Sequence, residues 1–397
     1  MEKTEGKIRY GLIGIGAQGG SYARFLTNAP APFPGMVCAP CPDNCALGAL
    51  CDIDPEKEKM CKEQYPDVPF FKDWKDMIAS GTVDAIITTV PHYLHHEISI
   101  YAMEHGMNVL CEKPLCLTTQ EAEMMRTAAQ KAGRFLSIGY QIDYRRDVLA
   151  LKQDILAGRF GAPKRIAVYH GFRRGANYYA RNDWAGHITC HGREVFDSPF
   201  TNACAHHFQM LTFLLGPTMR TACDITGVQA ELYRGNPNVE NYDVAALRFK
   251  IAGDTPILYY TAHPIRTECW GPVGVMEFEK ATITYTGEKP VFHGVMADGT
   301  PFDYDAVAPG GDMQKLVDAI TATVTGEPPI CGVEADLPHI HAVRLVQQNP
   351  ITPIRPELVE QVEQDGDRFY FVKNLEETLA DCARHWALPG ELGIKLG

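Results

Sequence analysis

The chain has 397 residues, of which 45% are apolar, and this length and composition predict two domains that each bury a core. The formal net charge of −12 at pH 7 argues against nucleic acid as a partner, because neutralising phosphates requires an excess of Lys and Arg. No apolar run reaches the ~18 residues of a membrane helix, and no apolar signal core precedes the first strand, so we expect a cytoplasmic protein with no membrane contact.

The N-terminal segment carries the most specific motif. Residues 8–13 form an apolar run, Gly14, Gly16 and Gly19 follow in the spacing GxGxxG, and apolar residues then continue at helical spacing. This order of strand, turn and helix is typical of a dinucleotide-binding loop, although the same letters also occur in ordinary Gly-rich turns. Gly14 permits the tight turn, Gly16 lets the backbone approach a pyrophosphate, and Gly19 lets the helix pack on the strand. We expect the helix start to hold the phosphates of a nicotinamide dinucleotide.

A second strand is predicted over residues 46–51, after an inserted loop rich in Pro and Cys over 29–45. It ends at Asp52, where an acidic side chain can accept hydrogen bonds from both ribose hydroxyls of NAD. Ile53 follows, where a 2′-phosphate would call for Arg or Ser, so the pattern favours NAD over NADP. The alternative for Asp52 is a simple carboxylate at a strand end.

Three cysteines in the inserted loop, Cys38, Cys41 and Cys45, have spacings that a Zn or Fe–S site can use. However, the chain contains 13 cysteines, so a local cluster is less surprising than in a cysteine-poor protein. In a reducing compartment we expect free thiols that act as small apolar side chains, and no metal. A structural metal stays open as the alternative.

Further strands over 84–90 and 108–111 alternate with helical patterns, which predicts a parallel sheet with right-handed crossovers. Pro91 and His92 follow the first of these strands, and Glu112 follows the second. Ligands of open α/β sheets bind outside the carboxyl ends of the strands. We therefore expect Pro91 and His92 to border the nicotinamide side of the cofactor and Glu112 to belong to the cofactor-binding site, the alternative for the histidine being a turn at the surface.

Beyond Gly139 the pattern changes to mostly alternating apolar segments. The strands predicted there lack intervening helices, which indicates an antiparallel or mixed sheet, and they cover residues 165–169, 244–251, 257–262, 275–278 and 282–285. Two helical patterns over 313–323 and 335–348 are expected to pack back across this sheet. The predicted fold is α/β: a Rossmann doubly wound parallel sheet over 1–140, an α+β domain with an open, mostly antiparallel sheet for substrate and oligomer contacts over 141–348, and a C-terminal extension over 349–397 that packs on the domains.

Glu112-Lys113-Pro114 makes the interpretation more specific. Together with the GxGxxG start, the acidic strand end and a Pro-x-x-x-His segment, it resembles the Gfo/Idh/MocA family of oxidoreductases. The resemblance implies oxidation or reduction of hydroxyl groups on sugars, inositols and related polyols. It also implies that Lys113 lies beside the nicotinamide and handles the proton, that the bond before Pro114 is cis, and that copies associate as a homodimer or homotetramer.

The role implied for Lys113 also makes chemical sense. Hydride transfer from a carbinol carbon requires removal of the hydroxyl proton, by a group whose pKa lies near the working pH. Partial desolvation and a cationic nicotinamide would lower the pKa of a lysine toward that range. Glu112 could orient Lys113, although a structural ion pair is equally natural. The plain alternative for Lys113 is a solvated lysine after a strand.

A second family motif, Asp-x-x-x-His-x-x-Asp on a helix, matches the segment from Asn202 to Gln209 and places the motif's histidine at His206. Asn202 and His206 are four residues apart, so on a helix both face the same way. Both Asp positions are replaced, by Asn202 and Gln209, which puts a mechanism that relies on a carboxylate there in doubt. We expect Asn202 to bind a substrate hydroxyl and His206 to share proton transfer, the alternative being a buried core histidine.

A polar and aromatic segment over 178–186 interrupts the β pattern just upstream. Its Arg181 and Trp184, with Tyr140, have the combination of flat rings and hydrogen-bond donors that a sugar-binding wall requires. Any one of these residues has a structural alternative, but as a group they are expected to line the substrate pocket.

The expected function is an NAD-dependent oxidoreductase that acts on a secondary hydroxyl of a sugar, glycoside or cyclitol. One alternative on the same scaffold is a redox-assisted glycosidase or lyase, in which tightly held NAD transiently oxidises a ring hydroxyl before elimination. A further alternative is a non-catalytic sensor with a dinucleotide fold.

Overall fold

The computed structural model describes residues 6–29, 40–287, 291–305 and 311–397. The chain divides into two compact units, one made of Met1–Arg146 with Val307–Leu337 and the other of Asp147–Ala306 with Pro338–Gly397. Residues 307–337 thus belong with the N-terminal residues, whereas the sequence patterns grouped them with the second domain. None of the helices in the described ranges is long and apolar enough to cross a membrane.

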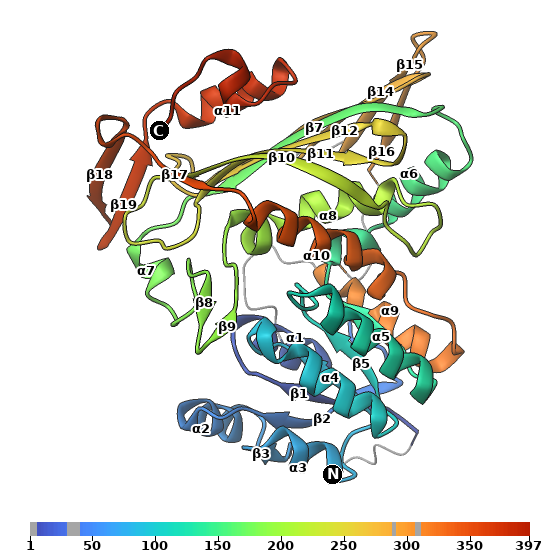
Figure 1. The fold of residues 1–397 in the computed structure, drawn as a ribbon. Helices are drawn as coiled ribbons and strands as arrows, with labels where there is room; N and C mark the ends of the chain where they lie inside the picture. The colour runs from blue at the N-terminus through green and yellow to red at the C-terminus, as the bar shows by residue number, and fades with distance from the viewer. Residues whose placement is uncertain (1–5, 30–39, 288–290, 306–310) are drawn as a thin grey trace. The chain divides into compact units, whose positions relative to one another are not determined.

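The first unit is built on a six-stranded parallel sheet with the order β3-β2-β1-β4-β5-β6 (Figure 1), which confirms the predicted doubly wound parallel sheet. Its strands are β1 (Ile8–Ile13), β2 (Cys45–Cys51), β3 (Phe70–Phe71), β4 (Ala85–Thr88), β5 (Asn108–Cys111) and β6 (Leu136–Ile138). Its helices are α1 (Ala17–Leu26), α2 (Pro55–Gln64), α3 (Trp74–Ala79), α4 (His95–Glu104), α5 (Thr119–Ala132) and α9 (Gln314–Thr325).

The ends of these helices follow local chemistry. Thr118 caps α5 through a capping box with Glu121, and Gly133 ends the helix in the left-handed conformation at φ 60°. Asp54 caps α2 by accepting a hydrogen bond from the backbone N–H of Glu56. Local capping interactions therefore define where both helices begin.

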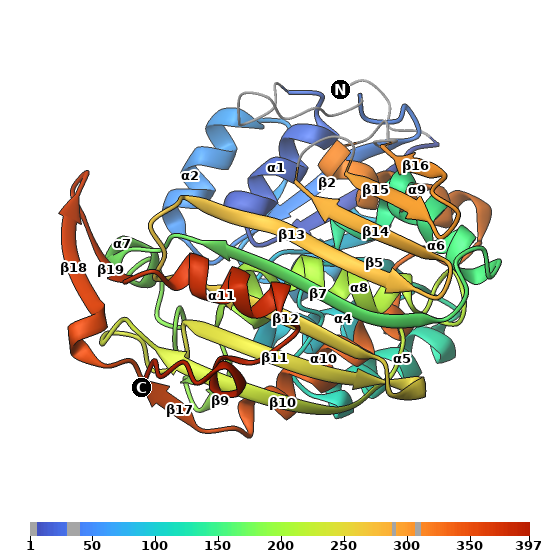
Figure 2. The same ribbon diagram turned by 90° about the horizontal axis from the view of Figure 1, so that it is seen from above.

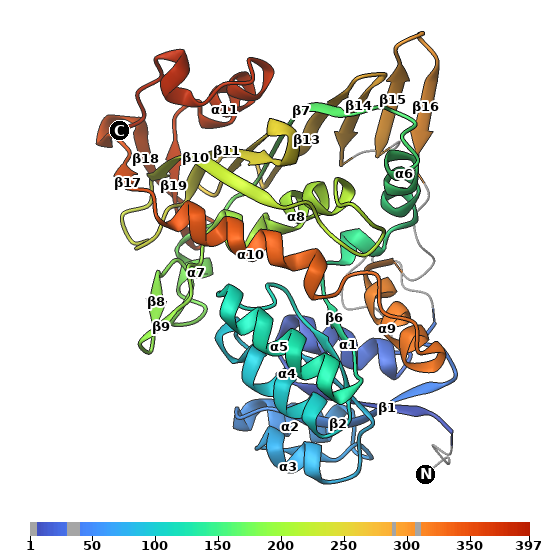
Figure 3. The same ribbon diagram turned by 45° about the vertical axis from the view of Figure 1, so that its right-hand side comes forward.

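One core cluster of the first unit lies on one face of β1 and its neighbours. Tyr10 and Leu12 of β1 pack against α1 and α2 on this face. Leu316 and Ile320 of α9 belong to the same core, and α9 lies beside the N-terminal sheet (Figure 3). The expectation that α9 packs across the C-terminal sheet was wrong, because helical periodicity defines an apolar face but does not identify the surface that this face covers.

The second unit contains a nine-stranded mixed sheet with the order β16-β15-β14-β13-β7-β12-β11-β10-β17 (Figure 2). The pairs β7–β12 and β10–β17 are parallel and the other pairs are antiparallel, so the predicted mixed, mostly antiparallel sheet is confirmed. The strands are β7 (Pro163–Phe172), β10 (Ile225–Arg234), β11 (Val244–Ile251), β12 (Pro256–Ala262), β13 (Cys269–Phe278), β14 (Ala281–Thr286), β15 (Phe292–Met296), β16 (Pro301–Tyr304) and β17 (Ile351–Pro353). Two hairpins, β8 (Thr189–Cys190) with β9 (Arg193–Glu194) and β18 (Val359–Gln364) with β19 (Asp367–Val372), stand apart from this sheet.

Helices cover both faces of the second sheet (Figure 1). Successive residues of β12 show this alternation, since the Tyr259 hydroxyl donates to the carbonyl of Cys204 beside α8 (Ala205–Leu214), and the Tyr260 hydroxyl donates to the carbonyl of Ala387 beyond α11 (Leu375–Arg384). The remaining helices are α6 (Arg146–Leu156), α7 (Ala176–Tyr179) and α10 (Val333–Gln347).

The C-terminal extension is part of this core, because α11 buries Leu375 and Leu379 against the sheet. Replacing Leu379 with alanine should therefore destabilise the protein by about 3 kcal/mol, from lost burial and the cavity left behind. The exposed Glu377 on the same helix provides the control Glu377→Ala, which should change stability by less than about 0.5 kcal/mol. Urea unfolding of both variants tests this; equal midpoints would show that α11 does not stabilise the sheet.

Candidate cofactor and catalytic site

The three glycines of the N-terminal motif differ in the space that surrounds them. Gly14 has a φ of 91°, and a Cβ there would come 3.0 Å from the backbone of Thr89. A Cβ on Gly19 would come 2.1 Å from the carbonyl oxygen of Gly14, so helix α1 can approach β1 only without one. A Cβ on Gly16 would meet no atom within 4 Å, which leaves the loop open where the N-terminus of α1 begins. This geometry suits an anion held by the backbone N–H groups of the helix start.

Gly19→Ala should therefore weaken NAD binding at least tenfold or destabilise the protein by about 1–3 kcal/mol, because a backbone clash cannot be relieved by rotating a side chain. The neighbouring Gly20 lies on the same helix, and a Cβ there would meet nothing within 4 Å. Gly20→Ala is thus a matched control that should leave binding unchanged. NAD titration and thermal unfolding of both variants test the claim, which fails if the two alanine variants behave alike.

Two side chains hold the glycine loop from neighbouring strand ends. Asp52, which follows β2, accepts a hydrogen bond from the backbone N–H of Ile15 at 2.6 Å. Thr89, which follows β4, donates its hydroxyl to the carbonyl of Gly14 at 2.5 Å. Asp52 was expected at this position from the sequence, but Thr89 was not, since a threonine after a strand has no distinctive signal. Ile53 is 86% exposed and offers no group for a 2′-phosphate.

The loops that follow β4 and β5 are joined by a buried histidine. His95 Nδ1 lies 2.9 Å from the carbonyl oxygen of Pro114, and Nε2 lies 2.9 Å from that of Val90. Burial lowers the pKa of His95 although both carbonyl contacts act to raise it. The bond before Pro114 is cis, as the family resemblance implied. Pro91 and the buried His92 lie at the start of the 3₁₀ turn that leads into His95.

Glu112 is buried at the end of β5 and is fully engaged by its neighbours. Its Oε1 lies 2.5 Å from the Lys315 ammonium and accepts the Tyr22 hydroxyl at 2.7 Å. Its Oε2 accepts the backbone N–H of Lys113 at 3.2 Å. Burial alone would raise the pKa of Glu112, but the Lys315 ammonium and these hydrogen bonds hold it below the usual range. Glu112 is therefore an ionised anchor for the strand end that carries Lys113.

Lys113 is partly exposed and follows β5 directly. The carboxyl ends of β1, β2, β4 and β5 share one edge of the parallel sheet, so Lys113 lies on the edge that also carries the glycine loop and Asp52. Tyr140 is fully buried, and this burial, together with nearby Asp336, raises the pKa of its hydroxyl well above the usual value. An enclosed ring favours a supporting role for Tyr140 over contact with a substrate.

In the second unit, Asn202 and His206 do not lie on the same helix, although the sequence predicted that they would. Residues Pro199–Ala203 form a wide π-helical turn, in which the N–H of Cys204 donates to the carbonyl of Pro199 at 2.8 Å. Helix α8 begins only at Ala205, so His206 lies in its first turn while Asn202 lies before it. The expectation that one helix carries both residues was wrong, because helical spacing in the sequence does not reveal the wider turn.

The carboxylate of Asp197, which lies outside the family motif, is close to Asn202. Asp197 is buried, its Oδ1 accepts the Asn202 amide at 2.9 Å, and its Oδ2 accepts the backbone N–H of Gly186 at 2.7 Å. Asp197 thereby ties Asn202 to the polar and aromatic segment over 178–186. Gln209, at the position of the second motif carboxylate, is fully buried in α8.

The segment over 178–186 forms a cluster of rings and cations. The Arg181 guanidinium lies 3.6 Å from the ring centroid of Tyr178 and 5.3 Å from that of Trp184. The Tyr179 hydroxyl lies 2.9 Å from Nδ1 of His263. The predicted neighbours Arg181 and Trp184 therefore do lie together.

A group of histidines beside α8 was not singled out from the sequence. His207 Nδ1 lies 2.7 Å from the Tyr285 hydroxyl, and its ring packs edge-on against His170. Burial lowers the pKa of His170 to about 4. The sequence signal was the adjacent pair His206 and His207. This pair does not predict a contact with Tyr285, which lies 78 residues further along the chain.

The cysteine cluster can be described only in part, because Cys38 lies outside the described residues. Cys41 and Cys45 are buried in the core of the first unit, with their Sγ atoms 3.1 Å apart. The hydrogen bond with Cys41, together with burial, raises the pKa of the Cys45 thiol.

The strand order and the glycine loop define the first unit as a dinucleotide-binding Rossmann domain. Residues 8–140 match a family model described as the Gfo/Idh/MocA oxidoreductase family with an NAD-binding Rossmann fold. The match covers the cofactor domain and supports the resemblance to this family over those residues.

Curated relatives match over part of their length. Inositol 2-dehydrogenase 1 of Saccharopolyspora erythraea is 26% identical over 212 residues, which cover 52% of this chain and 54% of the relative. Inositol 2-dehydrogenase of Burkholderia multivorans is 28% identical over 211 residues, which cover 53% of this chain and 55% of the relative. The chain thus spans about half the length of the curated relatives it matches.

Solved structures resemble the chain over most of its length. The WlbA dehydrogenase of Bordetella pertussis, solved with NADH and UDP-GlcNAcA, superposes with a TM-score of 0.67 at 20% identity and covers 86% of this chain and 96% of its own. The aldose-aldose oxidoreductase of Caulobacter crescentus, solved with glycerol, gives a TM-score of 0.69 at 19% identity and covers 86% of this chain and 97% of its own. These likenesses establish the fold of both units.

Proposed function

We propose that this protein is an NAD-dependent oxidoreductase that transfers hydride between a secondary hydroxyl of a sugar, glycoside or cyclitol and the nicotinamide. The observation that carries the proposal is the position of Lys113 after β5, on the sheet edge that also carries the open glycine loop and Asp52. A lysine held at this edge by the buried Glu112 and the loop-joining His95 is placed to exchange a proton with a bound alcohol.

The residues of the first unit fit NAD. The N-terminus of α1 beyond Gly16 offers N–H groups to the pyrophosphate, and Asp52 offers carboxylate oxygens to the ribose hydroxyls. The exposed Ile53 brings no positive charge for a 2′-phosphate, which favours NAD over NADP. When bound, NAD supplies the acceptor for the hydride. We propose that Pro91 and His92, at the adjoining strand end, border its nicotinamide side.

In the direction of oxidation, the neutral Lys113 amine takes the hydroxyl proton while the carbinol C–H bond breaks and its electron pair leaves as hydride. The alcohol becomes a ketone, and Lys113 becomes an ammonium that must release its proton before the next turnover. In the direction of reduction, the ammonium returns that proton to the carbonyl oxygen. Lys113 therefore acts as both base and acid.

The substrate-binding side is proposed for the second unit. Asn202, held by Asp197, offers its amide to a hydroxyl, and His206 in the first turn of α8 offers a second proton-exchanging group. Trp184 and Arg181 supply a ring face and hydrogen-bond donors, which suit a molecule whose C–H faces alternate with hydroxyls. Two similar proteins support a polyhydroxylated ring as the substrate class. One is named as an inositol 2-dehydrogenase, and the other was solved with UDP-GlcNAcA bound.

The association of copies is also proposed. A homodimer or homotetramer is expected from the family resemblance. Analytical ultracentrifugation of the full chain tests this expectation. A single monomeric species at micromolar concentrations would contradict it.

The function is tested by a spectrophotometric screen of inositols, aldoses and glycosides with added NAD. The proposal expects NADH absorbance to rise with at least one polyol and not with matched compounds that lack the secondary hydroxyl. If the protein binds NAD but forms no NADH with any compound, it is a sensor instead. Release of a cleaved glycoside without net NADH, from protein that retains NAD during purification, would instead indicate redox-assisted elimination.

A further inference from the structure

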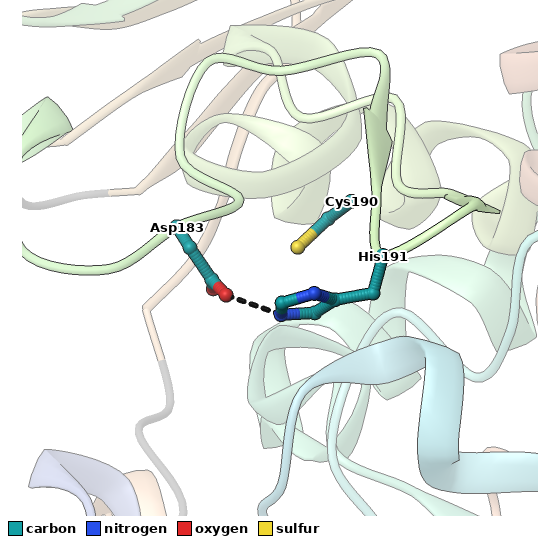
Figure 4. Close-up of side chains that lie close together, drawn as sticks. All are labelled: Asp183, Cys190 and His191. Atoms are coloured by element: carbon teal, nitrogen blue, oxygen red, sulfur yellow. Dashed lines mark hydrogen bonds and ion pairs between the residues drawn. The ribbon is translucent and has the colours of Figure 1, made fainter.

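Three different metal-ligating side chains meet at the tip of the small hairpin in the second unit (Figure 4). Asp183 lies in the loop after α7, Cys190 ends β8, and His191 begins the turn to β9. The ligand atoms of these three residues all lie within 4.8 Å of one another, and Oδ2 of Asp183 lies 2.5 Å from Nε2 of His191. We propose that Asp183, Cys190 and His191 form a Zn²⁺-binding site.

The backbone places these side chains by local rules. Cys190 pairs with Arg193 across the hairpin, and the two residues between them, His191 and Gly192, both have positive φ, at 50° and 73°. This is the turn type that matches the twist of a two-residue hairpin, and it usually favours Asn or Gly rather than His at its first position. Histidine is nevertheless among the few non-glycine residues that adopt a positive φ comparatively often, so the turn accommodates His191.

The third ligand is positioned independently of the hairpin. The side chain of Asn182 accepts hydrogen bonds from the backbone N–H groups of Trp184 and Ala185 at 3.2 and 2.8 Å, and this turn presents Asp183 toward the hairpin. Figure 4 shows the Asp183 carboxylate facing the Cys190 sulfur and the His191 ring, the first from the loop after α7 and the other two from the hairpin. An ordinary surface Asp–His pair needs no thiol beside it, so Cys190 is the feature that points to a metal.

The donor set selects the ion. A thiolate with an imidazole and a carboxylate suits Zn²⁺, whereas Mg²⁺ and Ca²⁺ prefer sites made only of oxygen. In a tetrahedral zinc site such ligand atoms lie roughly 3.3–3.6 Å apart, so shifts of about 1 Å would complete the geometry. Asp183 and His191 are more than half exposed, which gives an ion access from solvent and leaves room for water as the fourth ligand.

Binding would exchange protons for the metal. The Cys190 thiol must lose its proton, and the imidazole must be neutral, so one Zn²⁺ releases at least one proton and binds more weakly as the pH falls. The metal would also tie the hairpin to the loop that carries Trp184 and Arg181. Any effect of the metal on substrate binding through this loop rests on the proposed function, but the binding of the metal itself does not.

The test uses the full-length protein after chelator treatment, kept reduced with a phosphine, and titrated with Co²⁺ and then with Zn²⁺. We expect one equivalent of Co²⁺ to give a thiolate-to-cobalt charge-transfer band, and Zn²⁺ to remove it. Cys190→Ser should abolish the band, and His191→Ala, at an exposed turn position, should weaken binding at least tenfold. Cys269→Ser, at an exposed cysteine in β13, is the matched control and should behave as the wild type.

Circular dichroism establishes that each variant is folded before titration. Absence of the band in the folded wild type would overturn the proposal. A band that persists in Cys190→Ser would overturn it as well, and a band lost only in Cys41→Ser would place the metal at the N-terminal cysteines instead. None of these readouts depends on enzymatic turnover, so failure here and failure of the proposed oxidoreductase activity are distinguishable.

Discussion

Replacing Lys113 with methionine should lower kcat by about 10²–10⁴-fold, the usual contribution of a positioned acid or base. Methionine keeps much of the length and apolar body of lysine, so the strand end and its buried Glu112 should keep their structure. Because Asp52 and the glycine loop are unchanged, NAD should bind with nearly wild-type affinity. Steady-state kinetics with the best polyol from the screen, together with an NAD titration, provides the measurement.

Lys131→Met, at an exposed position near the end of α5, is the matched control and should leave kcat unchanged. Residual turnover of the Lys113 variant should increase with pH, since hydroxide can take over removal of the hydroxyl proton. If the Lys113 variant retains wild-type kcat, the assignment of the acid/base is wrong, whatever the substrate.

Replacing Lys315 with methionine should destabilise the protein by about 3–5 kcal/mol, because it leaves the buried Glu112 carboxylate without its ammonium partner. The double variant Glu112→Gln with Lys315→Met removes both charges and should be more stable than the single variant. Urea unfolding of the two single variants and the double variant forms a cycle that isolates the coupling between the residues.

The same pair has a defined dependence on pH. The pKa of Glu112 is lower in the folded protein than its ordinary value of 4.5, so the stabilisation is present above about pH 4.5 and is lost as the pH falls through the folded value. Without Lys315 burial dominates and raises that pKa, so the carboxyl group becomes neutral at higher pH. The stability difference between wild type and Lys315→Met should therefore be largest at neutral pH and shrink in acid. A difference that stays constant from pH 7 to pH 4 would show that the ion pair is not its source.

The first unit could be predicted well because its signals are local. The glycine spacing and the acidic residue at the end of β2 are both recognised from residues adjacent in the sequence, and Gly14 and Gly19 occupy positions where a positive φ or a close backbone contact favours glycine. Strand β3 and helix α3 were missed, since a strand of two residues is too short for any periodicity.

The parts that the sequence did not reveal depend on partners distant in the chain. Lys315 lies 203 residues from Glu112, and a lysine in an amphipathic helix usually indicates a solvated position rather than a buried ion pair. Asp197 stands near Asn202 only because of the wide turn over 199–203, which helical spacing does not reveal. Lys113 and Glu112 were accessible from the sequence, whereas Lys315, the partner that holds the Glu112 carboxylate, was not.

Hydride transfer from a carbinol carbon to NAD can be followed with an isotope that passes from the substrate to the cofactor. The polyol that gives the strongest NADH signal is prepared with deuterium on its ring carbons and incubated with NAD and the enzyme, and the cofactor is then analysed by mass spectrometry and NMR. We expect one deuterium on carbon 4 of the nicotinamide and a ketone in the product, and both should form about 10²–10⁴-fold more slowly with Lys113→Met. Unlabelled cofactor beside a converted product would contradict hydride transfer to NAD.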